Sequence, residues 1–158
     1  MEKISLKLFE FYNLDAELNG FTNQQTGEKI ASGLVQEKLS LVTKYWLSEL
    51  AKKVAAEKAS VEELKNELIK KYGKEDDKGS ISIPMVIEEV DEEGNVNKVL
   101  NPDYQSFEKE FNELLQAEKE IEYKVFSLED FEKVETSENY GTFFKLIKVQ
   151  EATVVPLS

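Results

Sequence analysis

The chain has 158 residues, of which 41% are hydrophobic and 33% are charged, and its net charge at pH 7 is −12. This length and composition are typical of one folded domain with a heavily solvated surface. Because Cys and His are both absent, the sequence excludes disulfides, thiolate metal sites and Ser-His-Asp catalysis. All 20 basic residues are Lys, so no guanidinium can bind phosphate or guanine in a bidentate manner.

The negative charge is concentrated in the second half of the chain. Residues 1–79 contain 13 Lys and 14 acids, whereas residues 80–158 contain 7 Lys and 18 acids. The second half would repel a polyanion, so we expect no nucleic-acid partner and no membrane partner. The negative charge is compatible with a role in solubility and also with binding of a basic protein partner. Residues 1–6 lack the apolar core of a signal peptide, and we therefore expect synthesis in the cytoplasm.

The first 40 residues predict short elements. Apolar residues alternate with polar ones from Ile4, which favours a strand within residues 3–11. Asn13 is expected to cap a short helix that ends at Gly20. Another short helix is predicted at residues 30–39, and Ser40 is the expected N-cap of the helix that follows.

Residues 41–73 have the strongest helical pattern and predict two consecutive helices. Ser60 and Glu63 form the sequence pattern of a capping box, which places the second start at Ser60. Gly73 is expected to end the second helix in a left-handed conformation. The apolar positions predicted to face the core are Val42, Trp46, Leu50 and Val54 in the first helix and Val61, Leu64, Leu68 and Tyr72 in the second.

The second half predicts a hairpin, a helix and further short elements. Residues 80–90 and 96–100 are expected to be strands joined by a turn at Gly94, with Pro84 marking an edge or a bulge. Asn101 and Pro102 are expected to start a helix. A strand at 120–126, a capping box at 127–130 and a last helix capped by Ser137 follow. The apolar stripe of the predicted helix comprises Tyr104, Phe107, Phe111, Leu114 and Leu115.

Together these elements predict an α+β fold in a single domain, residues 1–158. We expect amphipathic helices packed on a small, mostly antiparallel sheet built from residues 3–11, 80–100 and 119–126. The helices should then share one core, with the residues Trp46, Leu50, Leu68, Phe107 and Phe111. The surplus of aromatic residues is compatible either with a rich core or with a docking surface.

No catalytic, cofactor-binding or metal-binding residue is predicted. Asp91, Glu93 and Asn95 match the first spacings of a calcium loop, but Gly94 and Pro102 occupy positions that such a loop does not allow. Pairs of neighbouring carboxylates are common, but none is singled out for glycosidase-type hydrolysis.

The tail at residues 150–158 is the one candidate interaction segment. Its apolar residues Val154, Val155 and Leu157 are expected either to pack on their own domain or to dock on a neighbouring subunit. In the second case the predicted hairpin at 80–100 would offer an open sheet edge.

The order of elements from about residue 35 to residue 147 resembles a group of small tailed-bacteriophage proteins of unknown function. The resemblance is carried by EELKNELIKKYG at 62–73, EDDKG at 75–79, FEKEFNELL at 107–115, EIEY at 120–123 and SLED at 127–130. In those proteins the helices follow each other more directly, so residues 80–100 are interpreted as a β-hairpin insertion. The resemblance implies a phage origin and carries over no catalytic residue.

The predicted function is that of a non-enzymatic phage protein, a virion structural component or assembly factor. Its expected partners are other phage proteins, including further copies in a homo-oligomer. The alternative is an intracellular phage effector that binds and inhibits a host protein, with the acidic half as a nucleic-acid mimic. Either protein would be made in the host cytoplasm, and the virion component would then enter the particle. A carboxylate hydrolase is a third class that no residue pair favours.

Overall fold

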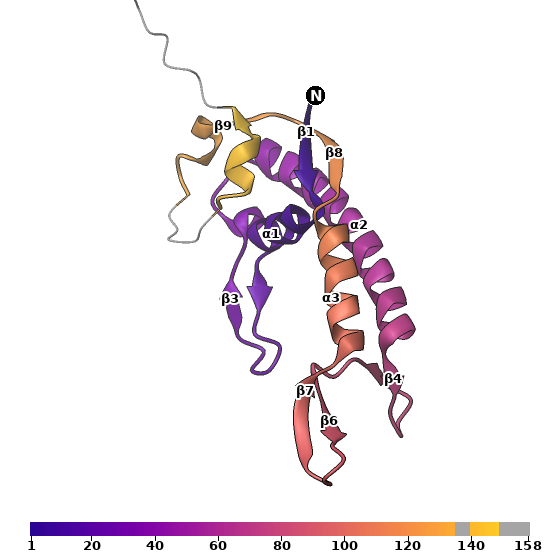
Figure 1. Ribbon diagram of the computed structural model, residues 1–158. Helices are drawn as coiled ribbons and strands as arrows, with labels where there is room; N and C mark the ends of the chain where they lie inside the picture. The colour runs from indigo at the N-terminus through magenta and orange to yellow at the C-terminus, as the bar shows by residue number, and fades with distance from the viewer. Residues whose placement is uncertain (135–139, 149–158) are drawn as a thin grey trace, which may run out of the picture. The chain divides into compact units, whose positions relative to one another are not determined.

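The computed structural model describes residues 1–134 and 140–148. These residues form an α+β fold, as the sequence predicts, with α-helices and small two-stranded sheets (Figure 1). They divide into two compact units: Met1–Ala56 with the described residues from Glu118 onward, and Glu57–Ala117. The single domain expected for residues 1–158 stays a prediction, which cooperative unfolding of both units would support.

The first unit contains the main antiparallel strand pair and most of the short elements. Strand β1 (Glu2–Lys7) pairs with β8 (Glu118–Tyr123), with Glu2 opposite Tyr123 and Lys7 opposite Glu118. The remaining elements are α1 (Leu8–Asn19), β2 (Phe21–Thr22), β3 (Lys29–Ala31), a 3₁₀ turn η1 (Leu34–Gln36), the first part of α2 (Leu41–Tyr72), β9 (Phe126–Ser127), η2 (Leu128–Phe131), η3 (Phe143–Leu146) and β10 (Ile147–Lys148).

The hydrophobic core of the structure lies in this first unit. Strand alternation places Leu6 and Ile121 in it, and the spacing of Phe11, Leu14 and Leu18 places one face of α1 against them. The other buried members are Leu34, Leu47, Leu50, Ala51, Val54, Tyr123, Phe126, Phe143 and Leu146. Elements far apart in sequence therefore depend on one another for burial.

The predicted three-part sheet is wrong. In the described part of the chain, residues 86–100 pair only with each other, and β1 pairs only with β8. Strand β1 also ends at Lys7, because α1 begins at Leu8 rather than near Asn13. Glu10 explains this early start, since its carboxylate accepts a hydrogen bond from the Lys7 amide and satisfies the first turn.

The predicted helix at 30–39 is also wrong. Residues 29–31 form β3, which pairs with β2, and only the 3₁₀ turn η1 follows. Gly33 lies between them with a φ of 86°, a conformation that interrupts a helix.

Helix α2 is one continuous helix, and the predicted break at Ser60 is wrong (Figure 1). Residues 41–72 contain neither Gly nor Pro, and Ala-rich sequence precedes Ser60, so helix propensity outweighs the capping pattern. Ser40 does cap the start, where its hydroxyl accepts from the Thr43 amide at 3.2 Å. Val42, predicted to be buried, is 68% exposed.

Gly73 follows α2, but not for the predicted reason, because its φ is not positive. A Cβ at this position would lie 2.4 Å from the Ile69 carbonyl oxygen and 2.6 Å from the Ile81 side chain. Glycine is therefore required here chiefly by the close approach of the Ile69 carbonyl, a backbone group that cannot move aside, and then by the Ile81 side chain.

The predicted shared core is wrong in three of its five members. Leu50 is buried in the core and Trp46 packs against it partly buried. Leu68, Phe107 and Phe111 belong instead to the second unit, and each is only half-buried. An apolar stripe indicates which face of a helix is hydrophobic, but it does not indicate what covers that face.

Glu10, which is buried, forms an ion pair with the exposed Lys145. Burial raises the pKa of the Glu10 carboxyl, but hydrogen bonds from the Lys145 ammonium and the Lys7 amide, together with the charges of both lysines, hold the pKa below its ordinary value of 4.5. The ionised carboxylate thus links α1 to η3.

Glu10→Gln is expected to lower the free energy of unfolding by about 1–2 kcal/mol near neutral pH. Because the pKa is lowered in the folded protein, the carboxylate stabilises the fold above the unfolded-state pKa, and this stabilisation is lost as the pH falls through the folded pKa. Urea melts across pH should therefore show the difference between wild type and variant shrinking as the pH falls below the ordinary carboxyl pKa of 4.5. Glu92→Gln, at an exposed position, is the control. A difference that persists in acid would instead assign the loss to packing.

Candidate interaction surface

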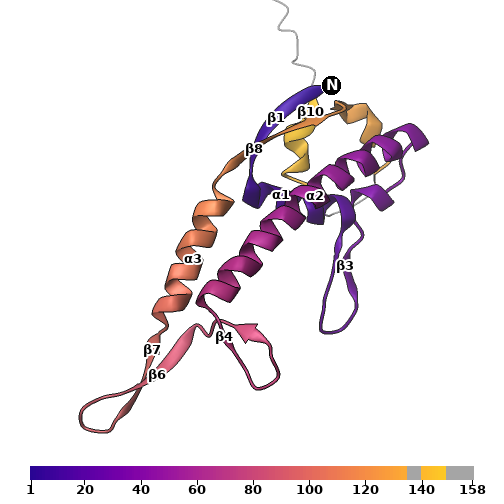
Figure 2. The same cartoon turned by 90° about the vertical axis from the view of Figure 1, so that its right-hand side faces the viewer.

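The second unit, Glu57–Ala117, consists of two helical segments and two hairpins. They are the last part of α2, the hairpin of β4 (Lys74–Glu75) and β5 (Ile81–Ser82), the hairpin of β6 (Val86–Val90) and β7 (Val96–Leu100), and α3 (Pro102–Leu115). Figure 2 shows α3 running beside the end of α2. The Lys71 ammonium lies 3.3 Å from the Glu110 carboxylate, and Lys65 lies 5.5 Å from the centre of the Phe111 ring.

This unit buries little apolar surface of its own. Among residues 57–117, all of which the structure describes, only Val61 and Asn101 are buried. Helix α3 has no buried residue, although Phe107 and Phe111 stack with their ring centres 5.8 Å apart. Side chains that form an apolar stripe thus remain half-exposed, which is typical of surfaces that bind a partner.

One groove of the unit is lined by three leucines, three glutamates and one lysine. It has a volume of about 670 Å³ and is lined by Leu64, Leu68, Leu114, Glu67, Lys71, Glu110 and Glu113. The Tyr72 hydroxyl and the Lys71 ammonium together hold the pKa of Glu110 below its ordinary value, so this carboxylate is charged at neutral pH. The groove can therefore accept an apolar side chain flanked by positive charge.

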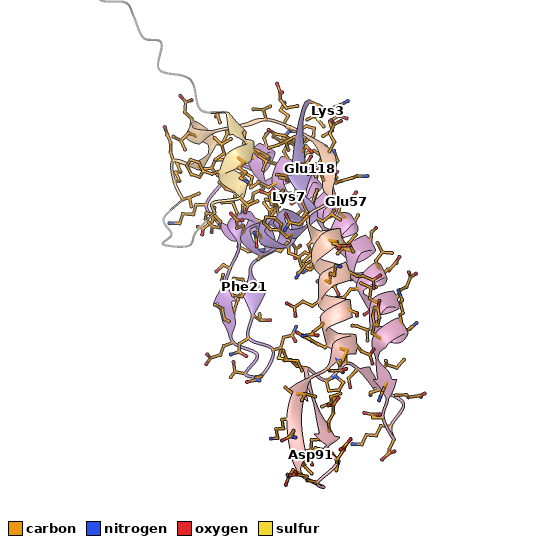
Figure 3. All side chains as sticks on the ribbon, in the orientation of Figure 1. Lys3, Lys7, Phe21, Glu57, Asp91 and Glu118 are labelled. Atoms are coloured by element: carbon orange, nitrogen blue, oxygen red, sulfur yellow. The ribbon has the colours of Figure 1, made fainter. Side chains whose placement is uncertain are left out.

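The β6–β7 hairpin is fixed at its tip. The Asp91 carboxylate accepts hydrogen bonds from the amides of Glu93 at 3.0 Å and Asn95 at 2.8 Å, and Gly94 adopts a φ of 85°, as the sequence predicts for this turn. The Asn95 amide is the main cause that lowers the pKa of Asp91. Figure 3 shows Asp91 at the end of the hairpin.

The same hairpin is fixed at its base by Asn101. The Asn101 side-chain oxygen accepts from the Asp103 amide at 3.1 Å and caps α3, which confirms the predicted Asn-Pro start. Its side-chain nitrogen donates to the Pro84 carbonyl at 2.8 Å, and its backbone amide donates to the Met85 carbonyl at 2.9 Å. One buried side chain therefore couples the helix start to the hairpin base.

The two-stranded hairpin leaves an apolar face open. Val86 is paired with Leu100, Glu88 with Lys98, and Val90 with Val96. Because alternate residues and directly paired residues share a face, these six residues form one surface, which we call the hairpin face. Val86 is 46% exposed, Leu100 57%, Val96 59% and Val90 68%.

Sequence reasoning missed the hairpin face. The alternation of Ile81, Ile83, Met85 and Ile87 predicts a strand at residues 80–90, and of these four only Ile83 and Ile87 are half-buried. The sequence does contain a signal for this face. Val86 and Val90 are separated by an even number of positions in one strand, and so are Val96 and Leu100 in the other, which places each pair on one side of its strand. A strand with apolar residues on both faces needs a covering element on each face. A two-stranded hairpin by itself covers neither face.

The other predicted features have the following places. Asp91, Glu93 and Asn95 lie in the hairpin turn, and no group of three or more carboxylates suited to a metal ion occurs in the described residues. Pro84 precedes β6 rather than lying inside it. The tail residues Val154, Val155 and Leu157 and the predicted cap Ser137 lie outside the described residues.

A second hollow lies in the first unit, with a volume of about 530 Å³. Phe21 and Ile30 of the β2–β3 hairpin line it and are 49% and 58% exposed (Figure 3 labels Phe21). The carboxylate of Glu17, which also lines it, accepts from the amides of Thr142 and Phe143 at 2.8 and 3.2 Å. That carboxylate therefore stabilises the start of η3.

Comparisons of this chain with family models, with curated proteins and with solved structures found no match. None of the helices in residues 1–134 and 140–148 combines the length and the apolar character needed to cross a bilayer.

Proposed function

We propose that this protein is a non-enzymatic bacteriophage protein, a virion structural component or assembly factor, that acts through protein–protein contacts. The observation that carries this proposal is the exposed apolar hairpin face, held at its tip by Asp91 and at its base by Asn101. An apolar surface on a fixed scaffold binds with little loss of conformational entropy. The phage origin rests on the resemblance of residues 35–147 in element order.

A second candidate is a phage effector that binds and inhibits a host protein. The groove lined by leucines and by Glu67, Glu110 and Glu113 favours this function, because it would suit a basic apolar segment of another protein. The two functions differ in where the protein is found after assembly.

Mass spectrometry of purified virions separates the two functions. A virion component should be present in a constant copy number relative to the major capsid protein and should stay with the particle in high salt. An effector should be absent from particles and should appear in the infected cell bound to one host protein. Absence from particles would overturn the proposal of a virion component, and an assembly factor would then be found bound to other phage proteins rather than to a host protein.

A further inference from the structure

We propose that the hairpin face binds the same face of a second copy of this chain, about a two-fold axis parallel to the strands. This inference rests on the proposed function, since it names a second copy as one of the protein partners. It is drawn from the register of β6 and β7 and from the side chains which that register places together.

The hairpin face has a charge pair between two apolar pairs. Glu88 and Lys98 stand opposite each other in the middle, with the pair Val90 and Val96 on the tip side and the pair Val86 and Leu100 on the base side. Within one copy, one strand thus presents a negative centre and the other strand a positive centre. Any face-to-face contact with a second copy must pair these centres in some way.

Two symmetric face-to-face arrangements are possible, and the charges distinguish them. A two-fold axis parallel to the strands places β6 of each copy over β7 of the other, so that Glu88 lies over Lys98. A two-fold axis across the strands places Glu88 over Glu88 and Lys98 over Lys98, which is repulsive. Only the first arrangement combines apolar contacts at both ends with attraction in the middle.

Symmetric pairing of the β6 edges is disfavoured by the same side chains. An antiparallel pair of β6 strands centred on Glu88 or on Glu89 would place two identical carboxylates directly opposite each other. Like charges directly opposite each other destabilise a strand pair. The face is therefore the more favourable contact for β6.

The size of the hairpin face sets the strength of the contact. Six side chains cover far less than the roughly 800 Å² per partner of a standard stable interface. We therefore expect weak self-association of the free chain, and strong association only where several copies are held together. This behaviour suits a component that assembles on a particle and stays dispersed before assembly.

Charge reversal of the full-length chain tests the arrangement by sedimentation equilibrium over a wide concentration range. Glu88→Lys alone and Lys98→Glu alone should each weaken self-association about tenfold, because each replaces attraction with repulsion. An equimolar mixture of the two variants should recover the wild-type association. Glu89→Lys, which makes the same charge change on the opposite face of β6, should associate as wild type does.

The mixture separates contact between copies from damage within one copy. Each variant still has like charges opposite each other in its own hairpin, so a recovery on mixing arises only between copies. A wild-type chain that is monomeric throughout, or a mixture as weak as its components, would overturn the inference. A monomeric chain found in virions would leave the proposed function standing, whereas an associating chain absent from virions would overturn the virion proposal alone.

Discussion

Phe11→Ala is expected to lower the free energy of unfolding by about 3–5 kcal/mol, because Phe11 is fully buried in the core of the first unit. Removing its ring deletes part of the apolar face of α1 and leaves a cavity in a core to which several other elements contribute. Urea melts followed by far-ultraviolet circular dichroism give the difference directly. The shift in midpoint should occur without a change in slope.

Phe111→Ala is the matched control for this prediction. Phe111 is on the apolar stripe of α3, but it is only half-buried, so its loss should cost about 1–2 kcal/mol. Equal losses for Phe11 and Phe111 would contradict the core described here. They would instead support the single shared core that the helical patterns alone predicted.

Gly20→Ala is expected to lower the free energy of unfolding by about 3–5 kcal/mol, for two reasons. Gly20 has a φ of 74°, which an L-residue with a side chain adopts only with strain. A Cβ at this position would also lie 2.1 Å from the carbonyl oxygen of Ala31 and 2.6 Å from the carbonyl carbon of Ser32. Both contacts are with backbone, which cannot move aside as a flexible side chain can.

Gly27→Ala separates the two causes. Gly27 has a similar φ of 72°, but a Cβ there would meet nothing within 4 Å. Its replacement should therefore cost only about 1 kcal/mol, the cost of the backbone conformation. Thermal or urea unfolding of both variants checks the difference, and equal losses would show that the close approach of Ala31 and Ser32 to Gly20 contributes nothing.

The two glycines Gly20 and Gly33 allow the backbone to pass very close to the end of α1. A Cβ on Gly33 would lie 2.4 Å from the Gly20 amide nitrogen, so the chain before η1 crosses the end of α1 at backbone contact. Leu34, which follows Gly33, and Leu18, near the end of α1, both belong to the core cluster. The short β2–β3 hairpin is the connection that makes the crossing possible.

Local chemistry determined the starts and turns of several elements. Ser40 caps α2, Asn101 caps α3 with Pro102 at its first position, Gly94 forms the hairpin turn, and Ser127 begins η2 with Asp130 closing its capping box. These features are set by hydrogen bonds between residues a few positions apart. Their physical causes are therefore contained in a short stretch of sequence.

Competition between local preferences decided other features, and there the sequence patterns misled. The capping pattern at Ser60 was real, but the surrounding residues favour helix strongly enough to continue α2 through it. Glu10 capped α1 from inside the predicted strand and thereby moved the helix start forward. In both cases two local signals overlapped, and their relative strength was not visible from either one alone.

By itself, the sequence determined the α+β class, the lack of Cys, His and Arg chemistry, and most of the apolar stripes of α2 and α3. Only the tertiary structure decided that β1 pairs with β8, that Phe11 is buried while Phe111 is half-exposed, and that the hairpin face is open. The reason is that alternation and helical periodicity identify an apolar face from neighbouring residues alone. What covers that face depends on residues distant in sequence, and for the hairpin face we propose that it is a second copy of the chain.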